Sequence, residues 1–122
     1  MYAIVNGQTN GRGLVAVLHY DGHAWRRVAT SQAQYSSRQL VAPDGTGGLW
    51  IPVAGGTNGA GRYMLHYAAG KLTVAQLPFP AEAGNIDAVT RILGTRYALA
   101  GDERYTTGEP GTNQVAAILQ YS

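Results

Sequence analysis

Four neighbouring side chains toward the end of the chain form the strongest candidate for a ligand-binding site: Asp102, Glu103, Arg104 and Tyr105. Acidic groups beside an arginine can contact a polar ligand, and an aromatic ring can stack on a sugar. Two carboxylates at a set separation are also what most glycoside hydrolases use. A solvated charge cluster on a loop has the same composition, so the binding site and the charge cluster are both kept as interpretations.

The histidines offer a second kind of chemistry. His19 and His66 stand at the same place in two copies of a Leu-His-Tyr phrase, and the third copy has Gln120 there. A metal site needs three or four convergent ligands, so we predict a structural role instead, with each ring packed and one nitrogen hydrogen-bonded. Asp21, between Tyr20 and Gly22, is predicted to be a turn residue.

No catalytic constellation emerges from the remaining residues. The chain has no Cys, and its seven acids group only at positions 102–109. No Ser/His/Asp signature is present. The Gly-rich residues 55–61 are followed by no Lys-Ser or Lys-Thr, so they are not a phosphate-binding loop. We predict no catalytic residue, no metal and no cofactor.

Composition narrows the function classes further. The 122 residues are the length of one domain, with 45% hydrophobic and 13% charged residues and 17 Gly. The net charge is +2 with a single Lys, and no clustered basic stripe is present, which argues against nucleic-acid binding. No apolar run approaches the roughly 18 residues of a membrane span. No signal peptide follows Met1, so the chain is either cytosolic or a fragment of a longer protein.

Short apolar runs separated by Gly and Asn predict strands throughout. The expected strands are 2–7, 14–20, 24–29, 38–42, 49–55, 63–67, 71–77, 86–93, 97–101 and 115–121. The segment 86–93 also fits one face of a helix, with Gly94 as its cap, but the repeat requires a strand there. Residues 30–37 are expected to be a polar connector, and residues 102–111 a long loop.

Two of these strands carry further expectations. Both faces of strand 14–20 are largely apolar, so we expect it to be covered on both sides. Strand 49–55 contains Pro52, which removes a backbone donor, so we expect it to be irregular or partly at a sheet edge.

The strands recur with a period of about 47 residues. Thr9-Asn10-Gly11 returns 48 residues later, Leu18-His19-Tyr20 returns after 47, and Val53 aligns with Leu99 at 46. Leu65 to Leu119 is longer, at 54, because of the loop at 102–111. A period of this size with four short strands is typical of β-propeller blades. The predicted fold is an all-β propeller fragment of about three antiparallel blades, at 1–36, 37–84 and 85–122, with the first and last incomplete.

The repeat unit resembles a family of propeller-like proteins common in actinobacteria, loosely called kelch-like or galactose-oxidase-like. The matching residues are Leu18–Gly22 with Trp25 and Val28, Leu49-Trp50 with Val53–Gly55, and Leu65–Tyr67. The chain departs from the pattern at Gln120 and ends before the next Asp-Gly turn. The resemblance implies a propeller architecture and favours an extracellular location, and it carries over no active site.

These observations lead to one preferred function and two alternatives. A partial ring exposes apolar blade faces, so we expect self-association, or completion by the remainder of a parent chain. The preferred function is a non-catalytic scaffold that binds a glycan or a protein. The alternatives are part of a secreted propeller hydrolase acting on polysaccharide, and a purely structural module of a larger sensor or adhesin.

Overall fold

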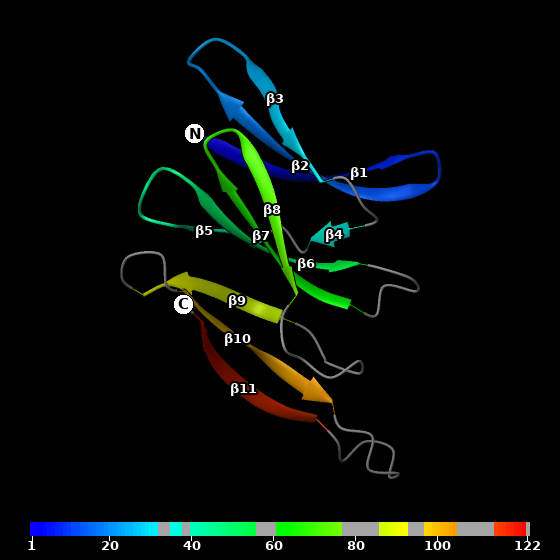
Figure 1. Ribbon diagram of the computed structural model, residues 1–122, viewed down its shortest axis with the longest axis vertical. Helices are drawn as coiled ribbons and strands as arrows, with labels where there is room; N and C mark the ends of the chain where they lie inside the picture. Colours follow the sequence, from blue (N-terminus) through cyan, green and yellow to red (C-terminus); the bar gives the residue numbers. More distant parts are fainter. Residues whose placement is uncertain are drawn as a thin grey trace.

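The chain folds into antiparallel β-sheets, as the computed structural model in Figure 1 shows. The structure describes residues 1–31, 35–37, 40–55, 61–76, 86–92, 97–104 and 114–121. Strands are the only regular elements in these ranges, and the part of the chain described holds no helix that could cross a membrane. The prediction of an all-β chain is confirmed.

The first sheet consists of β1 (Tyr2–Thr9), β2 (Arg12–Tyr20) and β3 (Trp25–Thr30), in that order. Thr9 pairs with Arg12, so the first hairpin turns on Asn10 and Gly11 alone. Their φ values of 52° and 75° lie in the left-handed region. Asn-Gly adopts that region readily, which is why this dipeptide marks the tight hairpin.

The second sheet consists of β4 (Tyr35–Ser37), β5 (Ala42–Pro43), β6 (Leu49–Gly55), β7 (Gly61–Ala68) and β8 (Lys71–Gln76). Both β4 and β5 pair with β6, which is therefore a central strand. β4 ends opposite Val53 and β5 starts opposite Trp50, so the partner strand is interrupted around Pro52. Proline offers no N–H to a neighbouring strand, which accounts for the break.

Two expectations about this region are corrected. Residues 35–37, expected to be connector, form β4, and within the expected strand 38–42 only Ala42 is in a strand. Residues 38–39 lie outside the described ranges. Pro52 lies opposite the gap between β4 and β5, so the expectation that strand 49–55 is irregular or partly at a sheet edge is confirmed at this position.

The third sheet consists of β9 (Ile86–Arg91), β10 (Tyr97–Arg104) and β11 (Gln114–Tyr121), with β10 in the centre. The ambiguous segment at 86 is therefore a strand, as the repeat required. β10 continues to Arg104, so the first three residues of the expected loop at 102–111 belong to a strand.

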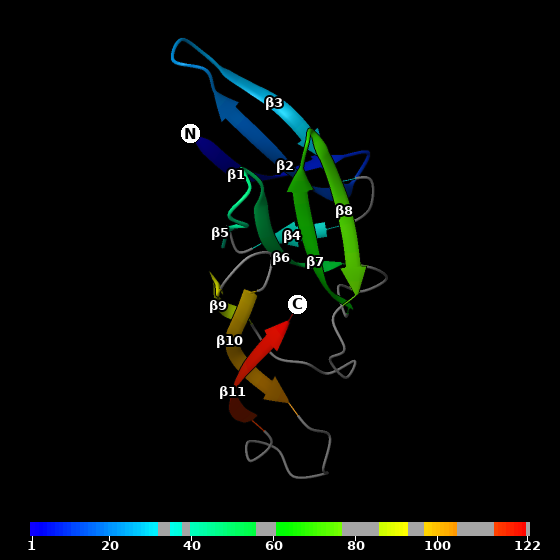
Figure 2. The same ribbon diagram turned by 60° about the vertical axis from the view of Figure 1, so that its left-hand side comes forward.

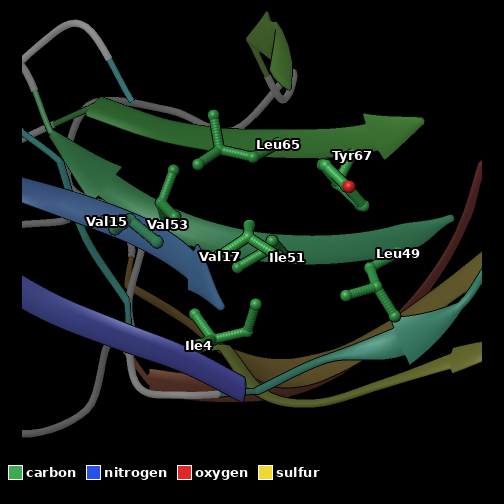
Figure 3. Packing of buried hydrophobic residues seen from close by; sticks show 8 residues of the cluster. All are labelled: Ile4, Val15, Val17, Leu49, Ile51, Val53, Leu65 and Tyr67. Atoms are coloured by element: carbon green, nitrogen blue, oxygen red, sulfur yellow. The ribbon is translucent and has the colours of Figure 1, made fainter. Parts of the chain in front are cut away.

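The three sheets lie one above another along the long axis of the molecule (Figures 1 and 2). The core is formed between the first two sheets, where β1 and β2 face β6 and β7 (Figure 3). Its buried members are Ile4, Val15, Val17, Leu49, Ile51, Val53, Leu65 and Tyr67. Alternate side chains of a strand point to opposite faces, so the intervening residues of β6 and β7 face the third sheet.

One face of the first sheet is left without a neighbour among the described segments (Figure 1). Val15 and Val17 are fully buried against the second sheet, whereas Leu14, Leu18 and Tyr20 alternate to the other side and are only half-buried. We call this side, with Ala3 and Val5 of β1, the outer face. Ala16, on the same side, is buried, so the expectation that strand 14–20 is covered on both sides is met at Ala16 and not at Leu14, Leu18 and Tyr20.

The pairing register reveals how the sheets correspond. Tyr2 lies opposite His19, Trp50 opposite His66, and Ala98 opposite Gln120. Positions 2, 50 and 98 are spaced by 48 residues, so β1, β6 and β10 repeat with one constant offset. By this register Leu99 corresponds to Ile51, which corrects the alignment of Leu99 with Val53 by two residues.

Candidate functional site

The most highly organised polar cluster in the described residues centres on a buried carboxylate. Asp44 is completely buried, and its Oδ2 lies 2.7 Å from Nε2 of His66. Its Oδ1 accepts hydrogen bonds from the backbone N–H groups of Thr46 at 2.7 Å and Gly48 at 2.9 Å. We refer to these groups as the Asp44–His66 pair.

Local sequence explains how the carboxylate is held. Asp44 begins a loop of Asp-Gly-Thr-Gly-Gly that joins β5 to β6, and Gly45 and Gly47 both have φ near +90°. Gly48 has no room for a side chain, because a Cβ there would collide with the carboxylate of Asp44 and the carbonyl oxygen of Tyr67. The glycines therefore let the loop fold back around the carboxylate.

Aromatic rings extend the cluster toward the third sheet. The ring of His66 stacks on Trp50 at 4.0 Å with an interplanar angle of 19°, and Trp50 meets Tyr97 at 4.7 Å. The first sheet repeats the arrangement: His19 lies 4.8 Å from Tyr2, and Tyr2 meets Tyr67 of the second sheet at 5.6 Å. The same face of the first and second sheets thus presents an aromatic–histidine pair to the next sheet.

The carboxylate of Asp44 is stabilised in its charged form. Burial alone would raise the pKa of Asp44, but the hydrogen bond to His66 and those from Thr46 and Gly48 outweigh it. The pKa of Asp44 is therefore well below its ordinary value of 3.8. A charged acceptor strengthens each of these hydrogen bonds.

The residues expected from sequence lie elsewhere. Asp102, Glu103 and Arg104 are the last residues of β10 and pair with Ala116, Val115 and Gln114. Tyr105 lies outside the described residues. This candidate binding site therefore stays a prediction.

The two histidines and Asp21 follow their expectations to different degrees. His66 is packed and hydrogen-bonded, as predicted. His19 is packed against Tyr2, and no hydrogen bond to its ring is found within the described ranges. The carboxylate of Asp21 accepts hydrogen bonds from the backbone N–H groups of His23 and Ala24 at 2.8 and 2.9 Å, which confirms the turn role.

Comparison of the chain with protein-family models, curated proteins and solved structures finds no match. The chemistry of the Asp44–His66 pair must therefore be argued from its geometry alone.

A carboxylate that fixes a histidine ring is half of an acid–base relay, which also requires a reacting group within hydrogen-bond reach. Here one face of the ring is covered by Trp50, and the histidine side chain is 26% exposed. The described residues contain no group of three or more His, Cys, Asp or Glu that could hold a metal ion. The geometry favours a structural clasp that ties the β5–β6 loop to β7.

His66 was singled out from the sequence, but its partner Asp44 was not, so this pair was missed. A usable signal existed: Trp50 stands six residues after Asp44, which begins an Asp-Gly turn. Trp50 in turn lies opposite His66. Forty-eight residues after Asp44 and Trp50 stand Ile92 and Ala98, and the third sheet has Gln120 in place of the histidine. Asp44, Trp50 and His66 are therefore all replaced in the third sheet.

A groove of about 580 Å³ lies between the edge strands β3 and β8. It is lined by Ala29, Thr30, Ser31, Tyr35, Gly70, Lys71, Leu72, Thr73 and Val74. The hydroxyl of Ser31 accepts a hydrogen bond from the backbone N–H of Val15 and so helps to hold β3 near the core.

The low pKa of Asp44 makes stability depend on pH. In acid, the unfolded chain takes up a proton at this carboxyl before the folded chain does, so the free energy of unfolding falls as pH drops below 3.8. We expect the difference in melting temperature between the native chain and Asp44→Asn to be largest at neutral pH and to shrink toward about pH 2. A difference that is constant with pH would show that the carboxylate charge contributes nothing.

Proposed function

We propose that the chain is a non-catalytic scaffold segment of the β-propeller type, in which each sheet acts as one blade. The observation that carries this proposal is the repeated sheet-to-sheet contact. Tyr2 of the first sheet meets Tyr67 of the second, and its counterpart Trp50 in the second sheet meets Tyr97 of the third. Contacts between corresponding faces of successive repeats are what a ring or array of repeats requires.

The same repetition supports the outer face as the surface used for binding. On β7, Tyr63, Leu65 and Tyr67 form the face that receives the first sheet. Their counterparts on β2 include Leu18 and Tyr20 of the outer face, which receive no sheet in the described structure. Apolar faces of this kind mark interaction surfaces. The ligand of the outer face is therefore a sheet with the opposite face exposed, supplied by a second copy of the chain.

Trp25 is a natural reporter of this association. It lies opposite Tyr20, its ring is 5.3 Å from the tyrosine ring, and the residue is 46% exposed. The residue of the second sheet that corresponds to Trp25 is Leu72, because Leu72 lies opposite Tyr67 as Trp25 lies opposite Tyr20. Leu72 packs against the core. The exposure of Trp25 is thus explained by an uncovered outer face.

We expect the chain to associate with rising concentration and Trp25 to become buried as it does so. The measurement is particle mass by light scattering, with the fluorescence of Trp50→Phe, in which Trp25 is the only tryptophan. The emission maximum should move to shorter wavelength as mass rises to that of two chains.

Leu18→Arg should keep the chain monomeric because it places a charge in the outer face. Val41→Arg is the matched control, because Val41 is 43% exposed and lies outside that face. A single monomeric mass with unchanged emission at all concentrations would contradict self-association.

The binding of glycans and the hydrolase alternative depend on Asp102, Glu103, Arg104 and Tyr105, and they stay predictions. A parent chain that supplies the missing sheet is the alternative to a second copy.

A further inference from the structure

The edge of β1 differs from its counterparts in the other two sheets. β6 has β7 on one side and β4 and β5 on the other, and β10 has β11 and β9. β1 is paired with β2 alone among the described strands. The first sheet therefore has a vacant position where the second and third sheets each hold a strand.

The open edge of β1 carries the groups needed to bind a strand. The N–H of Tyr20 donates to the carbonyl oxygen of Met1 at 2.9 Å, which sets the alternation of the antiparallel ladder. The backbone groups of Tyr2, Ile4 and Asn6 then lie on the side away from β2. No described strand pairs with these backbone groups, although the side chain of Asn6 exchanges hydrogen bonds with the backbone of Ser37 on β4 at 2.7 and 2.8 Å. An unpaired row of backbone groups is a template for strand addition.

Ile4 gives this edge a donor that the corresponding edge of β6 lacks. Its counterpart at an offset of 48 residues is Pro52, around which the partner strand is interrupted. In the third sheet, where Ala100 has the same place, β9 pairs on both sides of this position, with a shift of register between Ala100 and Gly101. Ile4 has an N–H group, so it can donate to an incoming strand where Pro52 cannot.

His19 adds a chemical requirement to the incoming strand. In the second sheet, the strand that pairs with β6 ends in Asp44, and its carboxylate binds Nε2 of His66. His19 occupies on β2 the place that His66 has on β7, and it too lies against an aromatic ring, that of Tyr2. Its ring has no hydrogen bond among the described residues.

We propose that the β1 edge and His19 together form a receptor for an extended peptide that pairs antiparallel with β1 and places an aspartate against His19. The chemistry of the occupant is that of residues 35–48 of this chain, in which a mixed polar and apolar run, 35–41, leads to an Ala-Pro-Asp-Gly turn. This inference rests on the repeat correspondence that underlies the proposed function, but it concerns a different surface from the outer face.

The test is titration of the full chain with a synthetic peptide of residues 35–48, compared with the same peptide carrying Asp44→Asn. We expect saturable binding of one peptide per chain, with the Asn peptide about tenfold weaker or more, because a hydrogen bond to a charged group is lost. In His19→Gln the two peptides should bind equally. Leu18→Arg, which blocks the outer face, should leave peptide binding unchanged.

Amide chemical shifts locate the bound peptide independently of any variant. Changes centred on Tyr2, Ile4 and His19 are expected. The receptor would be overturned by the absence of binding or by equal affinity of the Asp and Asn peptides for the native chain. It would also be overturned by shifts centred on β6, which would show that the peptide displaces residues 35–48 of the chain from that strand. If the chain stayed monomeric but bound the Asp peptide more tightly than the Asn peptide, self-association would be contradicted and the receptor would be supported.

Discussion

Asp44→Ala should destabilise the chain by about 3 kcal/mol or more. The substitution removes the acceptor of the Thr46 and Gly48 N–H groups and leaves the imidazole of His66 without its partner. Asp44 is fully buried, so water does not readily replace the lost bonds. Chemical denaturation with tryptophan fluorescence measures the change, because Trp50 stacks on His66 and reports the loss of the cluster.

Asp21→Ala is the matched control for this substitution. Asp21 also accepts two backbone N–H bonds in a turn, and its carboxylate contacts Nε of Arg26 at 3.2 Å. The hydrogen bonds of Asp21 are exposed, so water can take their place and a much smaller loss is expected. Equal losses at both positions would mean that burial and the histidine partner of Asp44 contribute little.

The sequence was sufficient for local structure wherever a short-range rule applied. Asn10-Gly11 supplied positive φ values to a two-residue hairpin, and Asp21 closed the next turn. At Ile86–Arg91 the apolar spacing fitted a helix and a strand equally, and only the repeat favoured the strand that is observed. The all-β class follows from such local signals together.

Features that depend on long-range pairing could not be read in the same way. The polar segment at 35–37 has no strand pattern, yet it pairs with β6 because that strand has an open side there. The Asp44–His66 pair joins residues 22 positions apart, and its formation depends on register rather than composition. The alignment of Leu99 was two residues off because a shift of two keeps every side chain on the same face of a strand.

Substitutions at Leu65 and Leu18 should separate the effects of a covered and an uncovered sheet face. Both residues occupy the same place in the Leu-His-Tyr phrase, on β7 and β2. Leu65 is fully buried because the first sheet covers it, and Leu18 is half-buried on the outer face. We expect Leu65→Ala to lower the free energy of unfolding by about 2–5 kcal/mol, through lost burial and the cavity left behind.

Leu18→Ala should cost about 1 kcal/mol or less in the isolated chain, because much of its side chain already contacts water. The same substitution should weaken association by about tenfold or more if the outer face receives another sheet, because Leu18 then becomes a core residue like Leu65. Denaturation in the dilute chain measures the first quantity, and the concentration dependence of particle mass measures the second. If Leu18→Ala destabilised the monomer as strongly as Leu65→Ala, the outer face would already be covered within one chain, and neither a second copy nor a parent chain would be needed to complete it.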